Sequence, residues 1–206
     1  MIDKLRKYDE LFARNRSSGN ELSNEIFVFE NRGSNLILSA PHATKTFCNK
    51  REKCADLFTG AIVKLVGEEA EISTLIRYKY MPQKVLISDF VAEKSIQNHY
   101  FLDVHGFNKD IDYDVCLGIA DGNENSYPYL AGVVEIIRKY GLKVVVNHSD
   151  YSGRFGFTGR YQKMFGKPNV IQIELKKYLR DFYENQSIVQ NVTIPMLKEV
   201  AKLYEC

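Results

Sequence analysis

The sequence predicts an α/β protein with a three-layer α/β/α arrangement, in which helices cover both faces of a mixed, mostly parallel central sheet. Three observations predict this class. Short apolar runs typical of buried strands recur along the chain, segments with helical spacing of apolar residues alternate with them, and no repeat or linker interrupts the pattern. The 206 residues are therefore expected to form a single domain over residues 1–206.

Local patterns justify the elements of the first half in order. They predict a helix before a break at residues 17–20, strands over 26–29 and 36–40 that pair as a hairpin, a helix from Cys54 or Ala55 to Val66, and strands over 71–78 and 84–89. Gly67 supplies the stop of the second helix.

The second half continues the alternation of strands and helices. We expect strands over 99–105 and 114–120, a helix over 127–140, a strand over 143–146, a short helix over 160–165, a strand over 170–175 and a last helix from about 187 to 204. Pro195 is expected to kink or restart that last helix, because proline cannot donate the helical hydrogen bond. The segment 151–159 before the short helix is rich in glycine and aromatic residues.

Composition excludes several classes of function. The net charge is +2, from 28 basic and 26 acidic residues scattered over both halves, which does not suggest a nucleic-acid partner. The densest basic stretch, residues 45–53, is interpreted as a solvated loop. No window approaches the ~18 apolar residues of a membrane span and the first residues lack an apolar signal segment, so no membrane partner and a cytoplasmic location are expected.

Cysteine usage agrees with that location. Four cysteines occur without CxxC spacing, and in a reducing compartment they are expected to be free thiols: Cys48, Cys54, Cys116 and Cys206.

Two histidines stand at the ends of predicted strands. His42 follows Pro41, which cannot continue a strand ladder, and His105 shares a strand face with Asp103. An aspartate two residues before a histidine can orient its ring, which is the usual arrangement around a metal ligand. Gly106 lets the chain turn or a ligand approach closely. His99 and His148 are interpreted as surface or loop residues.

Carboxylates supply the remaining candidates. Glu174 ends the run 170–173 on the same strand face as Gln172, and near a bound metal it could serve as a general base. Asp56 lies at the predicted first turn of the second helix, where it is either a metal ligand or a helix cap. Glu52 could take the same ligand role, and the sequence does not separate the two.

Open α/β folds place their chemistry at the carboxyl ends of parallel strands, so these side chains are expected to converge. Two imidazoles, one carboxylate ligand and one free carboxylate match a catalytic zinc site with three protein ligands and an open position. The sequence thus indicates a metal-dependent hydrolase.

With these residues in place, the chain resembles the N-formylglutamate amidohydrolase family and, more distantly, the phage-type poly-γ-glutamate hydrolases and zinc carboxypeptidases of phosphorylase/hydrolase-like fold. The resemblance covers about two thirds of the chain, and its motifs are Ser39-Ala40-Pro41-His42, Asp56-Leu57-Phe58-Thr59-Gly60, Leu102-Asp103-Val104-His105-Gly106 and Ile171-Gln172-Ile173-Glu174-Leu175 with Arg180 after it. It departs after His42, where Lys45 replaces the glutamate of the carboxypeptidase His-x-x-Glu, and in residues 147–151, which lack the Asn-Arg-Pro-Tyr run of formylglutamate deformylases.

The resemblance implies that His42, Asp56 and His105 bind Zn²⁺ and that Glu174 is the general base. The expected reaction is cleavage of an amide bond in an N-acyl amino acid or a peptide-like or γ-glutamyl substrate by a metal-activated water. Arg154 and Arg160 are the candidates for binding a substrate carboxylate or the oxyanion, because a guanidinium binds a carboxylate through two hydrogen bonds.

Two other functions remain open at this point. The chain could be a non-catalytic protein that keeps the fold and binds a carboxylate or peptide, since fold does not guarantee chemistry. It could also be a thiol enzyme that uses Cys48, Cys54 or Cys116. The sequence leaves the exact substrate, the physiological metal and the oligomeric state open.

Overall fold

The computed structural model of the protein describes residues 1–48 and 50–205. Its helices are α1 (Ile2–Ser17), α2 (Thr59–Ala70), α3 (Ile87–Glu93), α4 (Leu130–Lys139), α5 (Phe157–Phe165), α6 (Lys177–Arg180), α7 (Gln186–Ile188) and α8 (Ile194–Lys202), with a 3₁₀ turn η1 (Glu124–Ser126) and a π-helical turn η2 (Val189–Thr193). Within the described residues, no helix has the length and apolar character needed to cross a membrane.

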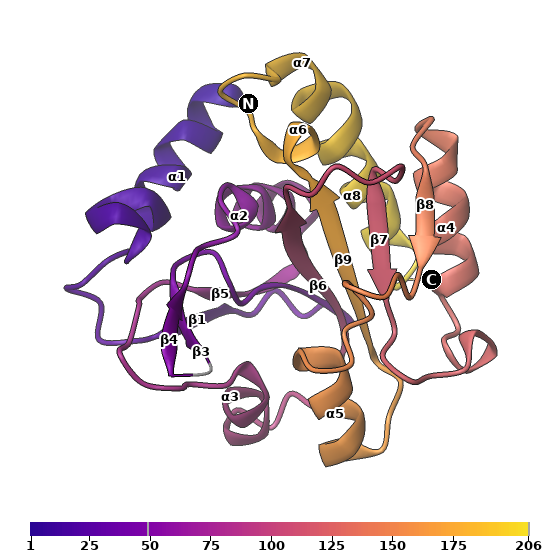
Figure 1. The fold of residues 1–206 in the computed structure, drawn as a ribbon, viewed down its shortest axis with the longest axis horizontal. Coiled ribbons are helices and arrows are strands. Elements are labelled where there is room, and N and C mark those ends of the chain that lie inside the picture. The colour runs from indigo at the N-terminus through magenta and orange to yellow at the C-terminus, as the bar shows by residue number, and fades with distance from the viewer. Residues whose placement is uncertain (49, 206) are drawn as a thin grey trace.

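A seven-stranded sheet forms the middle of the molecule (Figure 1). Its strands lie in the order β1 (Phe27–Glu30), β5 (Ser73–Arg77), β2 (Leu36–Ala40), β6 (Tyr100–Phe107), β9 (Val170–Lys176), β7 (Val115–Gly118) and β8 (Val144–Val146). The β5–β2, β2–β6, β6–β9 and β7–β8 pairs are parallel, whereas β1–β5 and β7–β9 are antiparallel. The predicted mixed, mostly parallel sheet is therefore confirmed.

Helices cover both faces of this sheet, as the three-layer prediction requires. One face packs on α1, α2, α4 and α8 through a large core that includes Leu38, Leu102 and Ile173. The other face packs on α3 and α5 through a smaller core around Phe101 and Tyr161. Figure 1 shows α3 and α5 together on one side of the sheet and α2 and α8 on the other. The face with the smaller core also carries the buried polar side chains of β2, β6 and β9.

Gly67 does not stop the second helix, which continues through it to Ala70. Two strand predictions in the first half are also wrong. Strands β1 and β2 do not form a hairpin, because β5 lies between them and pairs with both. Residues 84–89 do not form a strand but lead into α3, which begins at Ile87. Both errors come from reading local β propensity where contacts between distant segments decide the structure.

The second half agrees with its predicted elements. Strands β6, β7, β8 and β9 and helices α4 and α5 lie where the sequence placed them, with ends shifted by a few residues. The last predicted helix is split, since the π-helical turn η2 precedes α8 and Pro195 lies in the first turn of α8. Proline restarts the helix there because its missing N–H has no helical partner in a first turn.

A small hairpin lies outside the main sheet and forms a two-stranded sheet of its own. Strands β3 (Thr46–Cys48) and β4 (Arg51–Lys53) pair antiparallel in the connection from β2 to α2. The backbone N–H of Asp56 donates to the carbonyl of His42 over 2.8 Å, which closes the base of this excursion. The hairpin therefore brings two residues fourteen positions apart side by side at the end of β2.

Candidate metal and catalytic site

Buried polar side chains form a stripe across the central strands on the face that carries the smaller core. In the parallel register Ser39 lies opposite Asp103, Asp103 opposite Gln172, and His105 opposite Glu174. Residues opposite each other in a parallel pair point to the same face of the sheet. All five side chains are buried. The register of β2, β6 and β9 thus places these groups next to one another.

Both ring nitrogens of His105 contact carboxylates. The Nε2 atom lies 2.8 Å from Oδ2 of Asp103, and Nδ1 lies 3.0 Å from Oδ2 of Asp56. The Ser39 hydroxyl donates to the other oxygen of Asp103 over 2.5 Å. Burial alone would lower the pKa of His105, but the charges and hydrogen bonds of Asp103 and Asp56 raise it to about 10. His105 therefore carries a proton on each nitrogen in this arrangement.

His42 lies beside His105, with their ring centroids 5.0 Å apart. It follows the end of β2 directly, and its Nδ1 is 3.2 Å from Oγ1 of Thr46. Burial, and next the positive charge of Lys53, hold the pKa of His42 well below its ordinary value. The ring is therefore neutral at neutral pH, which is the form that binds a metal.

Asp56 does not lie in the first turn of the helix. Helix α2 begins at Thr59 rather than at Cys54 or Ala55, because the chain turns sharply at Phe58, where φ is 75°. Asp56 precedes that turn, and its side chain contacts His105 instead of capping the helix. Burial would raise the pKa of Asp56, but the hydrogen bond to the protonated ring of His105 outweighs this effect and holds the pKa well below its ordinary value.

Glu52, the other candidate carboxylate ligand, lies elsewhere. It belongs to β4, is exposed, and forms an ion pair with Lys45 over 2.8 Å. The basic stretch predicted as a solvated loop contains the paired strands β3 and β4; residues 50–53 are exposed, whereas Thr46 is buried. Of the two carboxylates, the structure brings only Asp56 to the histidines.

Glu174 is buried beside His105 and makes no ion pair with the lysines that follow it. The Gln172 side-chain amide donates to its Oε1 over 3.0 Å, whereas Lys176 donates to the Ile111 carbonyl and Lys177 to Glu184. Burial raises the pKa of Glu174 to about 7, which is partly offset by the positive charge of His105. A carboxyl group that titrates near neutral pH suits a general acid and base.

Two buried arginines brace this region, and sequence reasoning assigned a role to neither. Arg180 donates to the carbonyls of Leu57 over 2.6 Å and Leu175 over 3.3 Å, and to the Asn108 side chain over 2.6 Å. It thereby ties the turn after Asp56 to the ends of β6 and β9. Gly106 makes room for it, since a Cβ there would lie 2.2 Å from Arg180 Nε. The glycine therefore admits a side chain of the protein itself, and the strand continues through it.

The second of these, Arg77, stands at the end of β5. It donates from Nε to the Pro41 carbonyl over 2.9 Å and from Nη2 to the Val85 carbonyl over 2.8 Å. It thus links the segment that carries His42 to the segment before α3. The sequence did contain a signal for Arg77. It is a charged residue at the end of the apolar run of β5, just as Glu174 is a charged residue at the end of the apolar run of β9.

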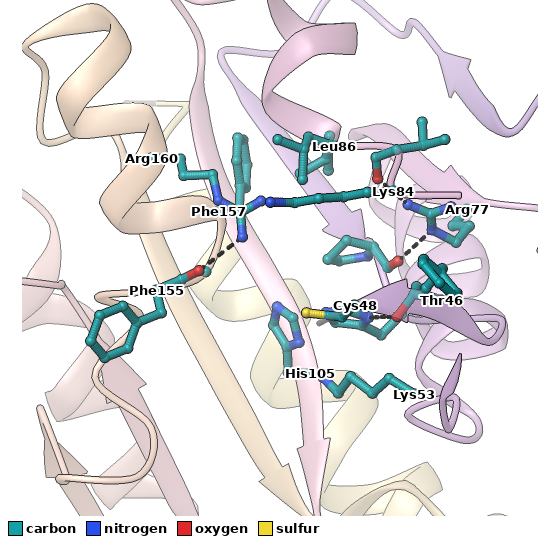
Figure 2. A pocket seen from close by; sticks show the side chains of 16 residues that line it. Thr46, Cys48, Lys53, Arg77, Lys84, Leu86, His105, Phe155, Phe157 and Arg160 are labelled. Carbon is teal, nitrogen blue, oxygen red and sulfur yellow. Dashed lines mark hydrogen bonds between the residues drawn. The ribbon is translucent and has the colours of Figure 1, made fainter. Parts of the chain in front are cut away.

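A cavity of about 210 Å³ opens beside the histidines (Figure 2). Arg160 lines it, whereas Arg154 is exposed and forms an ion pair with Asp121 over 2.5 Å. Of the two arginines proposed for substrate binding, only Arg160 faces the space next to the candidate ligands. The residues around the cavity are Pro41, His42, Thr46, Phe47, Cys48, Lys53, Arg77, Lys84, Val85, Leu86, Ile87, His105, Phe155, Gly156, Phe157 and Arg160.

The described cysteines are free thiols, as predicted, and Cys206 lies outside the described residues. Cys116 is fully buried, and its burial and the charge of Glu174 raise the pKa of the thiol to about 11. Cys54 is exposed, and Cys48 lines the cavity. The buried thiol of Cys116 is therefore protonated at neutral pH, which does not suit a nucleophile.

The side chains of His42, Asp56 and His105 are of the types that zinc prefers as ligands. In this structure they are not arranged around a common point that a metal ion could occupy. Within residues 1–48 and 50–205, no group of three or more His, Cys, Asp or Glu side chains has, as it stands, the geometry of a metal site. Instead the donors bond to each other and to Thr46. Asp56, Asp103 and the imidazolium of His105 carry a net negative charge together, and a cation between Asp56 and His105 would replace the proton on Nδ1. By donor type and charge, these residues fit a divalent metal ion.

No family model and no curated protein sequence matches the chain. Several solved structures, however, have a similar fold. A bacteriophage poly-γ-glutamate hydrolase superposes with a TM-score of 0.59 at 14% identity, covering 90% of each chain. An N-formylglutamate amidohydrolase from Ralstonia eutropha JMP134 gives a TM-score of 0.59 at 14% identity, covering 86% of this chain and 97% of that one. YNDL in an apo, zinc-free form gives 0.53 at 16% identity, covering 90% and 92%.

These similarities extend over nearly the whole chain but rest on shared architecture, because the sequences are so different. The predicted fold class is confirmed by both the sheet topology and these structures. The chain has the α/β fold of the N-formylglutamate amidohydrolase and poly-γ-glutamate hydrolase structures.

Proposed function

We propose that this protein is a zinc-dependent hydrolase that cleaves an amide bond in an N-acyl amino acid or in a peptide-like or γ-glutamyl substrate carrying a carboxylate. One observation carries the proposal: His105 lies between the carboxylates of Asp56 and Asp103, beside His42 and beside a buried Glu174. Two proteins of the same fold are a poly-γ-glutamate hydrolase and an N-formylglutamate amidohydrolase, and a third, YNDL, has been solved in an apo, zinc-free form.

The proposed metal ligands are His42, Asp56 and His105. A bound zinc ion would supply a Lewis acid that polarises the amide carbonyl and activates water. Asp103 is proposed to position His105, because it accepts a hydrogen bond from the ring nitrogen opposite Asp56 and is itself fixed by the Ser39 hydroxyl. Such carboxylate–histidine pairs around zinc fix the orientation of the ring and raise its basicity.

Glu174 is proposed to handle the proton of the reaction. Its carboxylate would take a proton from the attacking water and return it to the nitrogen of the leaving amine. Burial against β6 keeps this carboxyl group out of bulk water, and Gln172 holds one of its oxygens. Its pKa of about 7 allows both steps near neutral pH.

Arg160 is the better-placed candidate for binding a substrate carboxylate. It lines the cavity next to His105, and its Nη2 donates to the Phe155 carbonyl over 2.9 Å. The planar guanidinium keeps further donors for a carboxylate. Arg154 is paired with Asp121 and lies outside the cavity lining, so we assign it no role in the reaction.

The proposal is tested by metal content and turnover together. The purified protein should bind one zinc ion per chain, and the His42→Ala/His105→Ala variant should bind none. The matched control is His99→Ala, whose ring bonds to the Ile96 carbonyl at the opposite end of β6. Glu174→Gln should keep the metal and lose turnover on N-acyl amino acids or γ-glutamyl peptides by about a hundredfold or more.

Three results would contradict the proposal. A wild-type protein that binds no divalent metal would remove the site, and metal binding without hydrolysis of any acyl-amino acid or γ-glutamyl substrate would leave a binding protein. Full turnover in Glu174→Gln would show that another group acts as the base.

A further inference from the structure

A buried arginine lies where strand β2 leaves the sheet. In the parallel pair of β2 and β5 the last partners are Ala40 and Ile76, so the next pair along the register would be Pro41 and Arg77. Proline has no N–H with which to continue the ladder. The Arg77 side chain instead donates from Nε to the Pro41 carbonyl over 2.9 Å. A side chain thus extends the contact between the two strands to the residue before His42.

The charge of Arg77 has no counter-ion among the described residues. Arg77 is 4% exposed, its hydrogen bonds go to the neutral carbonyls of Pro41 and Val85, and its Cζ lies 4.4 Å from the centroid of the Phe27 ring. Burial lowers its pKa to about 10, so the guanidinium is still charged at neutral pH. Taking a charge out of water costs free energy that neutral acceptors offset only in part. Stability alone therefore does not account for an arginine at this position.

The backbone of His42 is held on both sides of its α-carbon. The carbonyl of the preceding Pro41 accepts from Arg77, and the carbonyl of His42 itself accepts the backbone N–H of Asp56 over 2.8 Å. The Nδ1 atom of the ring lies 3.2 Å from Oγ1 of Thr46. Thr46 and Asp56 both belong to the connection that contains the β3–β4 hairpin, whereas Arg77 belongs to the main sheet. Arg77 therefore fixes this segment relative to the central strands.

The other arm of the guanidinium reaches the wall of the cavity. Its Nη2 donates over 2.8 Å to the carbonyl of Val85, which lines the cavity in the segment that leads into α3. Figure 2 shows the two hydrogen bonds of Arg77 running in different directions. Because a guanidinium is planar and rigid, the two bonds fix the Pro41 and Val85 carbonyls relative to each other. One side chain thus sets the position of this wall relative to His42.

We infer that Arg77 is a positioning residue of the site, which holds the peptide between Pro41 and His42 in place relative to the sheet and to the cavity wall at Val85. The ring of His42 is thereby kept beside that of His105. The consequence for metal binding rests on the proposed function. The positioning of His42 does not, because hydrogen bonds within the chain carry it.

Hydrogen exchange at the Asp56 amide of the chelator-treated full chain measures this positioning, because that N–H exchanges when its bond to the His42 carbonyl opens. Arg77→Met fills the space with an apolar side chain of similar length and is expected to fold. We expect it to raise the Asp56 exchange rate about tenfold relative to the Leu102 amide, which lies in the central sheet and reports global unfolding. That factor corresponds to the loss of one hydrogen bond from a charged donor.

Arg32→Met is the matched control. Arg32 is half-buried and also donates to a backbone carbonyl, that of Ile72, but it lies at the start of β5, the end opposite Arg77. Arg32→Met should leave Asp56 exchange unchanged relative to Leu102. In Arg77→Ala, which leaves a space open to the cavity, a low concentration of guanidinium ion should slow Asp56 exchange again, whereas the same concentration of urea should not.

Equal acceleration of Asp56 and Leu102 exchange in Arg77→Met would overturn the inference, because the arginine would then contribute to stability alone; so would the absence of rescue by guanidinium. Zinc affinity separates the inference from the proposed function. We expect Arg77→Met to weaken zinc binding about tenfold, since one ligand is no longer held in place. Faster Asp56 exchange in Arg77→Met, in a protein whose wild type binds no zinc, would refute the proposed function and leave Arg77 as a positioning residue. Unchanged exchange in a protein that binds zinc would do the reverse.

Discussion

At the scale of single residues, the proton on His105 competes with the proposed metal. Asp56 and Asp103 raise the pKa of this ring to about 10, so at neutral pH a cation can bind Nδ1 only by displacing a proton. His42 is already neutral because burial lowers its pKa. The same carboxylates that hold the proton also attract the cation. Metal affinity is therefore expected to rise with pH.

Asp56 and Glu52 offer a direct comparison of two candidate carboxylate ligands. Asp56→Ala is expected to lower zinc affinity at least about tenfold, because it removes a donor 3.0 Å from His105. Glu52→Ala should leave the affinity unchanged, since Glu52 is exposed and pairs with Lys45. Competition against a chelator at fixed pH measures both. A loss in Glu52→Ala with unchanged affinity in Asp56→Ala would show that the hairpin, rather than Asp56, supplies the ligand.

The residues of this site were predictable to different degrees. The meeting of His42, His105 and Glu174 followed from their places at the ends of apolar runs, because the carboxyl ends of neighbouring parallel strands share one edge. The position of Asp56 did not follow, since it depends on the turn at Phe58.

At the scale of elements, the ends of β6 and β9 and the turn before α2 are joined through one side chain. Arg180 reaches over Gly106 and bonds to the carbonyls of Leu57 and Leu175. The site therefore depends on a strand position without a side chain. The packing of Arg180 also explains why the turn that carries Asp56 is fixed relative to His105.

Gly106→Ala tests this packing. The added Cβ would lie 2.2 Å from Nε of Arg180, so the arginine must leave its hydrogen bonds, and we expect a loss of about 1–3 kcal/mol in the free energy of unfolding. Urea denaturation measures it. In the Arg180→Ala background the same glycine substitution should cost much less, because the clash is gone. An equal cost in both backgrounds would place the strain in the strand backbone instead.

The wrong predictions at this scale share a cause. Residues 26–29 and 36–40 read as a hairpin because a turn-rich segment joins them, but β5 from later in the chain inserts between the two strands. Residues 84–89 contain Val85, Leu86 and Ile87, a β-prone run, yet this segment packs as the entry to α3. Sequence reveals local preference, whereas strand order is fixed by which distant faces bury each other.

At the scale of the whole molecule, a buried carboxyl group lies in the contact between α1 and the segment after α6. Asp9 on α1 is 6% exposed, and its Oδ2 accepts a hydrogen bond from the Tyr183 hydroxyl over 3.4 Å. Asp181, also buried, lies close enough for its negative charge to act on Asp9. The contact between α1 and the segment after α6 thus contains two acids, and among the described residues no basic side chain pairs with Asp9.

This arrangement predicts a pH dependence of stability. Burial, and to a lesser extent the charge of Asp181, raise the pKa of Asp9 from 3.8 to about 6 in the folded protein. The folded state therefore binds this proton more tightly than the unfolded state. The resulting stabilisation is fully present below about pH 4 and is lost as the pH rises through 6.

Asp9→Asn should remove that dependence, because an amide keeps the hydrogen bond to Tyr183 without a charge. We expect the variant to gain about 2–3 kcal/mol over the wild type at pH 8, following the shift in pKa, and little or nothing at pH 4. Urea denaturation across this range measures the difference. Asp3→Asn, on the exposed side of the same helix, is the matched control and should show no such gain. A gain for Asp9→Asn that is equal at pH 4 and pH 8 would mean that the carboxyl group is not buried against the C-terminal segment, and that α1 is held there by apolar contacts alone.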